Sequence, residues 1–156
     1  MGEALRRLPY KFSNSEWAVA RLGDLTTKIG SGATPLGGEK VYLKERVNFA
    51  LIRSQAVHDR FLDLEAISFI TDEAAQRLSS AEVNAGDVLL NITGDGTTFG
   101  RAALASVEAL PACVNQHVCI VRPDTSRLNA KFLLSYLTHP DTKHYIESFN
   151  AAGKAH

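Results

Sequence analysis

Residues 86–101 constrain the fold of this chain more than any other stretch, because a strand pattern there leads into a glycine-rich loop. The apolar residues Val88, Leu90 and Ile92 occupy alternate positions, which is the period-two pattern of a strand with one buried face. Residues 94–101 then bring three glycines, two threonines, an aromatic residue and an arginine to the end of that strand. The pattern predicts a core strand followed by an exposed loop.

Two other parts of the chain also predict polar loops. In one, polar residues follow an apolar strand pattern, and in the other they lie among glycines. Residues 47–52 have a strand pattern that leads into Arg53, Ser54 and Gln55, and residues 30–38 form a second glycine-rich stretch. Glycine lets a backbone approach a partner closely, while Arg, Ser, Thr and Gln side chains hold phosphates and read base edges. The alternative is loops that only reverse the chain, since polar loops on rigid scaffolds are common.

Composition limits the class of protein. With 156 residues, 45% of them hydrophobic, the chain is long enough for one domain with a real core. Seventeen basic side chains balance seventeen acidic ones, so nucleic-acid binding would need a local patch or a partner. Cys113 and Cys119 fit a reducing compartment. No apolar run approaches the roughly 18 residues of a membrane span and no signal-peptide pattern is present. We therefore expect a cytoplasmic protein without membrane contact.

The remaining patterns predict a mixture of helices and strands. Apolar residues from Trp17 to Ile29 have the spacing of one helical face, and Thr71 is a candidate N-cap of a short helix. Further strands are expected over residues 101–110 and 113–121, and further helices around Phe132–Leu137 and from Pro140 onward.

These elements indicate an α+β domain, in which a twisted, mostly antiparallel sheet is flanked by helices and presents a loop-rich face. Residues 1–16 mix charge, proline and a polar cluster, and we expect a lead-in segment there. The single domain is expected over residues 17–150, followed by a tail over residues 151–156.

Common catalytic motifs are missing from the sequence. The spacing of Gly94, Gly96 and Gly100 resembles a dinucleotide fingerprint, but Phe99 occupies the place of the third glycine and no βαβ unit surrounds it. Walker, nucleophile-elbow and zinc-metalloprotease motifs are also missing, as are those of amino-methyltransferases and common nucleases. We therefore assign no catalytic residue and expect no cofactor.

A second set of residues has two interpretations. Cys113, His117 and Cys119 share one face of the strand expected over residues 113–121. This arrangement suggests two possible functions, a zinc site or the active site of a Cys-His hydrolase. Buried thiols beside a polar histidine are favoured, because three ligands along one strand do not converge on a tetrahedral ion and no third group orients a nucleophile.

Four helix-spaced aromatic residues are likewise interpreted as core rather than as a base-stacking platform: Phe132, Tyr136, Tyr145 and Phe149. The other histidines, at positions 58, 139, 144 and 156, are interpreted as surface residues.

Six short motifs follow one another in a specific order. They are Trp17 with Val19–Leu25, Ser31–Pro35, Leu51–Val57, Gly86–Leu90 leading to Gly100–Arg101, Asn115–Val118, and Phe132–Leu137. In this order they resemble the target recognition domain of the specificity subunit of type I restriction-modification enzymes. The resemblance covers nearly the whole chain.

The resemblance implies a DNA-reading module with no catalysis of its own. In the family, a specificity subunit carries two such domains separated by long helices, and each domain reads half of a split double-stranded DNA target. The helices also dock modification subunits, which methylate adenine with S-adenosylmethionine, and a separate restriction subunit cleaves. This chain matches one domain without a spacer helix, so we expect an excised domain or a truncated product. Its glycine loop is longer than the family's and carries Asp95, which would repel phosphates unless it accepts from a cytosine amino group.

Candidate DNA contacts follow from the polar loops. We expect Arg53, Ser54, Gln55, Thr97, Thr98 and Arg101 to be the main contacts, and then Ser31, Thr34 and Lys40 on the first glycine loop. The alternative function is a small-ligand or peptide-binding module whose glycine loops line a pocket.

Overall fold

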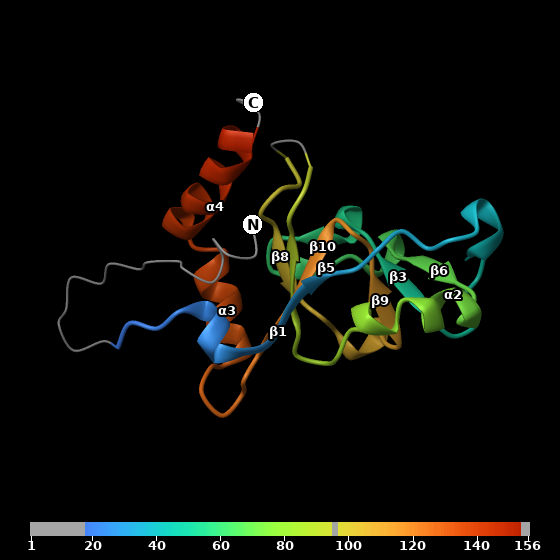
Figure 1. Cartoon of the computed structure of the whole chain (residues 1–156), viewed down its shortest axis with the longest axis horizontal. Coiled ribbons are helices and arrows are strands. Elements are labelled where there is room, and N and C mark those ends of the chain that lie inside the picture. The colour runs from blue at the N-terminus through green and yellow to red at the C-terminus, as the bar shows by residue number, and fades with distance from the viewer. Residues whose placement is uncertain (1–17, 95–96, 154–156) are drawn as a thin grey trace.

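The structure of this chain is a computed structural model that describes residues 18–94 and 97–153. Four strands form an antiparallel sheet, called sheet A, in the order β1-β10-β7-β8 (Figure 1). Their bounds are Thr26–Ser31 for β1, Val118–Pro123 for β10, Val88–Asn91 for β7 and Ala102–Leu104 for β8.

A second four-stranded sheet, called sheet B, has the order β2-β6-β3-β9, and only its β3-β9 pair is parallel. Its strands are Tyr42–Leu43 for β2, Ser68–Ile70 for β6, Ala50–Ile52 for β3 and Ala112–Val114 for β9. A separate hairpin pairs β4 (Val57–His58) with β5 (Phe61–Leu62). The predicted α+β class with mostly antiparallel pairing is confirmed, with the strands divided between two main sheets.

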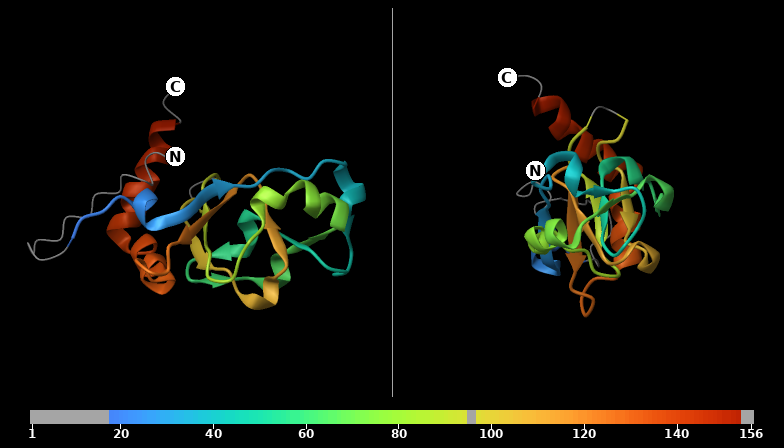
Figure 2. Two further views of the ribbon diagram at one scale, coloured as in Figure 1. Left: turned by 60° about the horizontal axis from the view of Figure 1, so that its bottom comes forward. Right: turned by 90° about the vertical axis from the view of Figure 1, so that its right-hand side faces the viewer.

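Within the described residues, three α-helices flank the sheets: α2 (Asp72–Arg77), α3 (Ala130–Leu137) and α4 (Pro140–Gly153). The left view of Figure 2 shows α3 and α4 at one end of the molecule and α2 toward the other. The N-cap prediction is confirmed, because Thr71 Oγ1 accepts a hydrogen bond from the backbone N–H of Ala74. No helix within the described residues is long and apolar enough to cross a membrane.

Strand β7 contributes to two hydrophobic cores. Val88 and Leu90 pack in a cluster with residues of α3 and α4, whereas Leu89 packs on the opposite side in the cluster that contains sheet B. All four residues of β7 are buried, so this strand is covered on both faces, not on one as its alternation predicts. Leu89, on the polar side of that alternation, is as apolar as its neighbours, so the sequence contained the signal for burial on both faces.

The helix predicted from Trp17 to Ile29 is wrong for most of its length. A short 3-10 helix covers Leu22–Leu25, and the chain then enters β1. Strand pairing with β10 decides this segment, because Lys28 to Ser31 pair residue by residue with Arg122 to Cys119. Tertiary pairing has overridden a local spacing that also fits a helix.

The strand predicted over residues 113–121 is two strands in different sheets. β9 ends at Val114 and β10 begins at Val118, and the turn between them is closed where Asn115 Oδ1 accepts from the N–H of His117 at 3.1 Å. An asparagine that bonds its own backbone two residues on is a common turn device. Cys113 therefore belongs to sheet B and Cys119 to sheet A.

The other boundaries differ less. Of residues 47–52 only Ala50–Ile52 form a strand, and Val47 is exposed. Of residues 101–110, three form β8, and a 3-10 turn follows at Val107–Ala109. The core interpretation of the helical aromatics is wrong for Phe132 and Phe149, which are 50% and 38% exposed, while Tyr136 and Tyr145 are half-buried.

Candidate nucleic-acid interface

The ends of four strands from both sheets meet at the beginning of β10. Ser31 and Asn91, the last residues of β1 and β7, pair with the first two residues of β10. Ile52 and Val114, the last residues of β3 and β9, pair with each other in sheet B. Because a three-residue turn joins β9 directly to β10, the loops that follow all four strands lie along one edge of the fold.

The turn at Asn115 fixes three of these segments to one another. Its backbone N–H donates to the carbonyl of Ile52 at 3.1 Å, and its carbonyl accepts from the N–H of Gly32 at 3.1 Å. A Cβ on Gly32 would lie 1.7 Å from the carbonyl oxygen of Val114, so only glycine allows this close approach of two backbones. The segments after β1 and β3 are therefore held rigidly beside the turn.

Asn91 joins the segment after β3 to the glycine loop. Its side chain is fully buried, and its Nδ2 donates to the carbonyls of Ser54 and Thr98, both at 3.0 Å. Its backbone N–H donates to the carbonyl of Arg101 at 2.9 Å. The carbonyls around Nδ2 fix the orientation of the amide, because only the NH₂ group can donate to them.

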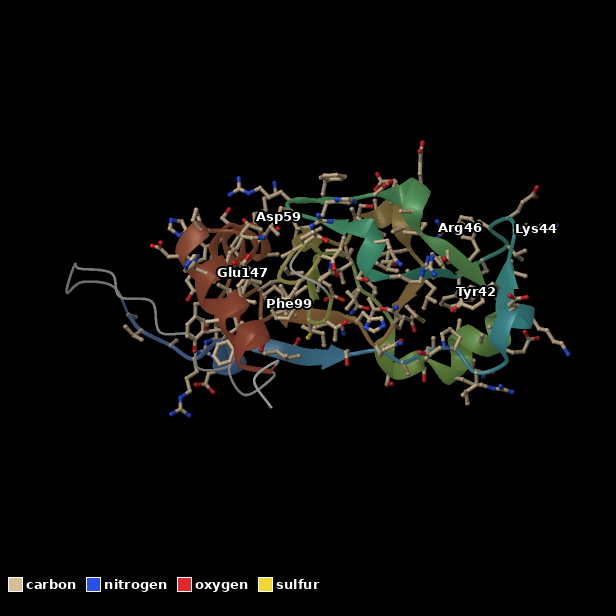
Figure 3. The ribbon with its side chains drawn as sticks, turned by 90° about the horizontal axis from the view of Figure 1, so that it is seen from above. Tyr42, Lys44, Arg46, Asp59, Phe99 and Glu147 are labelled. Carbon is tan, nitrogen blue, oxygen red and sulfur yellow. The ribbon has the colours of Figure 1, made fainter. Side chains whose placement is uncertain are left out.

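The glycine loop is also anchored on the side of α4. Phe99, labelled beside α4 in Figure 3, is 5% exposed and packs in the cluster that contains Leu133 and Ile146. Thr97 is exposed, Thr98 is half-buried and Gly100 is buried. The prediction of an exposed loop is therefore correct at Thr97 and wrong at Phe99 and Gly100, while residues 95–96 lie outside the described part of the chain.

We call the residues on this edge the strand-end cluster. It consists of Ser31, Arg53–Gln55, Thr97–Arg101 and Asn115–His117.

Two arginines of the strand-end cluster have no hydrogen-bond or ion-pair partner among the described residues. Arg53 and Arg101 are half-buried, yet neither guanidinium makes a hydrogen bond or ion pair with any described residue, and Arg53 Nε is fully buried. The other half-buried cationic side chains are bonded: Lys28 to a carbonyl, Arg122 to Asp87 and Lys143 to Asp59. Half-burying a cation without an acceptor costs free energy, so these two arginines are suited to a ligand that brings acceptors.

His117 adds further polar groups to the same edge. Its Nδ1 contacts Thr93 Oγ1, and its Nε2 lies 3.1 Å from Gln116 Nε2. Its carbonyl accepts from the N–H of Ile92 at 3.0 Å. Gln116 is exposed, as is Gln55, so the cluster presents amide groups of the kind that hydrogen-bond to base edges.

The structure brings most of the predicted contacts together, but not all of them. Arg53, Ser54, Gln55, Thr97, Thr98, Arg101 and Ser31 belong to the strand-end cluster. Thr34 is exposed in the loop after β1 and makes no hydrogen bond to a described residue of the cluster. Lys40 lies on the turn Gly38–Val41 next to β2, at the outer edge of sheet B, and Figure 1 shows this turn at the far end of the molecule from α4.

Sequence reasoning missed Asn91 and Asn115 as the residues that organise the site. Asn91 is the one polar residue of β7, and Asn115 opens a turn between two runs of buried apolar residues. A polar amide inside an apolar run is the signal that could have identified both, because a buried amide needs partners.

The two cysteines do not form a reactive site. Cys113 and Cys119 are buried and free, and burial raises the pKa of each thiol to about 11. Because the thiolate is the nucleophile and metal ligand, these thiols are unsuited to the Cys-His hydrolase. No group of three His, Cys, Asp or Glu residues in the described ranges is placed to hold a metal ion.

The fold and the strand-end cluster together define a class of protein: an α+β module that holds polar loops from two sheets on one rigid edge. The family model of the type I restriction modification DNA specificity domain matches residues 14–154. The chain therefore belongs to this family. The family resemblance in the sequence is confirmed.

Two solved structures share the fold. One comes from a study of complex assembly and conformational transition of the type I R-M system, with 21% identity and a TM-score of 0.58 over 93% of this chain and 31% of that chain. The other is the HsdS subunit from Thermoanaerobacter tengcongensis, with 21% identity and a TM-score of 0.53 over 94% of this chain and 33% of that chain. This chain thus spans about a third of each solved chain. No curated protein gives a significant match.

Proposed function

We infer that this chain is a sequence-specific DNA-binding module that reads one half of a bipartite target for a type I restriction-modification complex. The observation that carries this proposal is a pair of half-buried arginines, Arg53 and Arg101, that no described residue pairs with and that lie on loops held together by the core. A guanidinium donates two parallel hydrogen bonds to a guanine edge or to a phosphate, and either acceptor would repay the desolvation of these groups.

The partner subunits follow from the same proposal. The module would supply target recognition, while modification and restriction subunits, contacted through other parts of the assembly, would supply methylation and cleavage. No catalytic residue and no cofactor are assigned to this chain. Since its formal net charge is zero and phosphate neutralisation supplies most sequence-independent affinity, the module alone should bind DNA weakly.

The alternative of a pocket-binding module has less support. An open cleft lies along α4 and is lined by Pro140, Asp141, His144, Tyr145 and Ser148, none of which belongs to a glycine loop. The glycine loops instead pack against the core through Phe99 and against the backbone of Val114 through Gly32.

A selection experiment tests the proposal. The purified chain is incubated at about 50 mM salt, where phosphate contacts are strong, with a library of random-core DNA duplexes, and the bound duplexes are sequenced. Enrichment of one short sequence is the expected result. Salt-sensitive binding without enrichment would reduce the module to a phosphate-binding scaffold, and no binding would favour the pocket alternative.

A further inference from the structure

Asn91 stands between the two segments that carry the unpaired arginines. Its Nδ2 donates to the carbonyl of Ser54, the residue after Arg53, and to the carbonyl of Thr98, three residues before Arg101. The carbonyl of Val57 lies 3.4 Å from the same nitrogen. One side-chain amide therefore ties the backbone of both segments to β7.

The chemistry of Asn91 does not fit a residue kept for packing. Its side chain is 0% exposed. Its Oδ1 is buried without a hydrogen-bond partner among the described residues. A buried, unsatisfied oxygen costs free energy that an apolar side chain of the same volume would avoid. The useful part of the side chain is the NH₂ group, and its acceptors all lie in the two arginine segments or directly after one of them.

We propose that Asn91 is a positioning residue that sets the placement of the Arg53 segment relative to the Arg101 segment, so that both arginines engage one DNA site together. This inference rests on the proposed function. Asn91 itself is buried and acts only through the two loops.

Two substitutions distinguish positioning from packing. Asn91→Leu keeps the branching and the number of side-chain heavy atoms and leaves the carbonyls dry, whereas Asn91→Ala opens a polar space that a water molecule can enter and where it can donate to them. The quantity measured is the discrimination ratio, the Kd for a scrambled duplex divided by the Kd for the selected duplex. We expect Asn91→Leu to lower this ratio about tenfold or more and Asn91→Ala to lower it about threefold, with the Kd for the scrambled duplex changed less than about twofold.

If only packing mattered, the order would be reversed, because the cavity left by alanine would be the larger defect. A folded Asn91→Leu variant with the wild-type ratio, or an alanine variant worse than the leucine variant, would overturn the inference. Far-ultraviolet circular dichroism and thermal unfolding establish that each variant is folded at the temperature of the assay.

A double-mutant cycle tests the coupling directly. In the wild type, Arg53→Ala and Arg101→Ala should change the Kd for the selected duplex non-additively, and in the Asn91→Leu background their effects should add. Asp87→Asn is the matched control, because Asp87 precedes the same strand at its other end and bonds Arg122 instead of the loops. It should lower stability and leave the discrimination ratio unchanged. A wild-type ratio of one would reject the proposed function itself, whereas failure of the present inference alone leaves the wild-type ratio above one.

Discussion

Asp87 and Arg122 form a two-point ion pair that joins the start of β7 to β10. Arg122 Nε lies 2.7 Å from Asp87 Oδ1, and Nη2 lies 2.9 Å from Oδ2. The carboxylate is 1% exposed and also accepts from the N–H of Asn84 at 2.7 Å. The hydrogen bonds that Arg122 donates to Asp87 raise the pKa of Arg122 above its ordinary value.

Removing this carboxylate should destabilise the fold. Asp87→Ala removes the acceptor of the Asn84 N–H and leaves the guanidinium of Arg122 with only the carbonyl of Glu82, at 3.2 Å, as a protein acceptor among the described residues. Since Arg122 is 25% exposed, water can recover part of the loss. We expect a decrease of about 2–4 kcal/mol in the free energy of unfolding, measured by urea denaturation. The control Asp141→Ala removes an exposed carboxylate and should change it by less than about 0.5 kcal/mol. Equal effects of the two variants would show that the ion pair contributes nothing.

The unpaired arginines should have the opposite effect on stability. Arg53→Met and Arg101→Met keep the volume of a long side chain and remove a half-buried cation that no described residue pairs with. We expect the free energy of unfolding to stay unchanged or to rise by up to about 2 kcal/mol. Arg122→Met serves as the control and should destabilise the protein, because it breaks an existing ion pair. A large loss of stability in Arg53→Met or Arg101→Met would mean that these arginines serve the fold.

Gly32 should tolerate no side chain. The Cβ of Gly32→Ala would lie 1.7 Å from the carbonyl oxygen of Val114, so the backbone of β1 or β9 must move, at a cost of about 2–4 kcal/mol. Gly30→Ala, two residues earlier, places its Cβ where no atom lies within 4 Å, and we expect a change within about 0.5 kcal/mol. Thermal unfolding of the two variants measures the difference. Equal melting temperatures would contradict the close approach of the two backbones.

Alkaline pH should weaken the fold through its buried thiols. Burial raises the pKa of Cys113 and Cys119 from the ordinary 9.0 to about 11, so between these values the unfolded chain binds fewer protons than the folded one. Stability must therefore fall as the pH rises through this window.

The double variant Cys113→Ala and Cys119→Ala isolates this effect from other titrating groups. At about pH 8 the variant should be less stable than the wild type, because it loses two buried sulfur atoms, and at about pH 10.5 the difference should be smaller. A difference that is independent of pH would show that both thiols ionise as readily in the folded protein as in the unfolded chain.

The sequence predicted the segments that local chemistry decides. The helix capped by Thr71 and the helix around Leu133 depend largely on contacts within a few residues. The strand that contains Leu90 pairs with distant strands, but its run of apolar residues was a sufficient signal for it. The segment from Thr26 to Ser31 was predicted wrongly because its strand exists only through pairing with β10, about 90 residues away. Local spacing carries no information about such a partner.

In the candidate site, too, the sequence predicted what depends on residue type and local position, and it missed what depends on distant contacts. Arg53 and Arg101 were predicted from residue type and from their position at strand ends, and the fold brings their segments together. Asn91 was missed as the link because its role depends on carbonyls from residues 37 and 7 positions away. Lys40 was included from its place after a glycine-rich stretch, and sheet B carries it to the other end of the molecule.

The most direct test of the central claim is a set of parallel selections with the wild type, Arg53→Met and Arg101→Met on the same random-core duplex library. We predict that the wild type enriches one short sequence and that each variant loses preference at its own base pair, which corresponds to about 1–3 kcal/mol of discrimination for a bidentate base contact. An arginine that holds a phosphate would instead weaken binding to all sequences alike. Wild-type preferences and affinity retained by both variants would contradict the assignment of these arginines to the DNA interface.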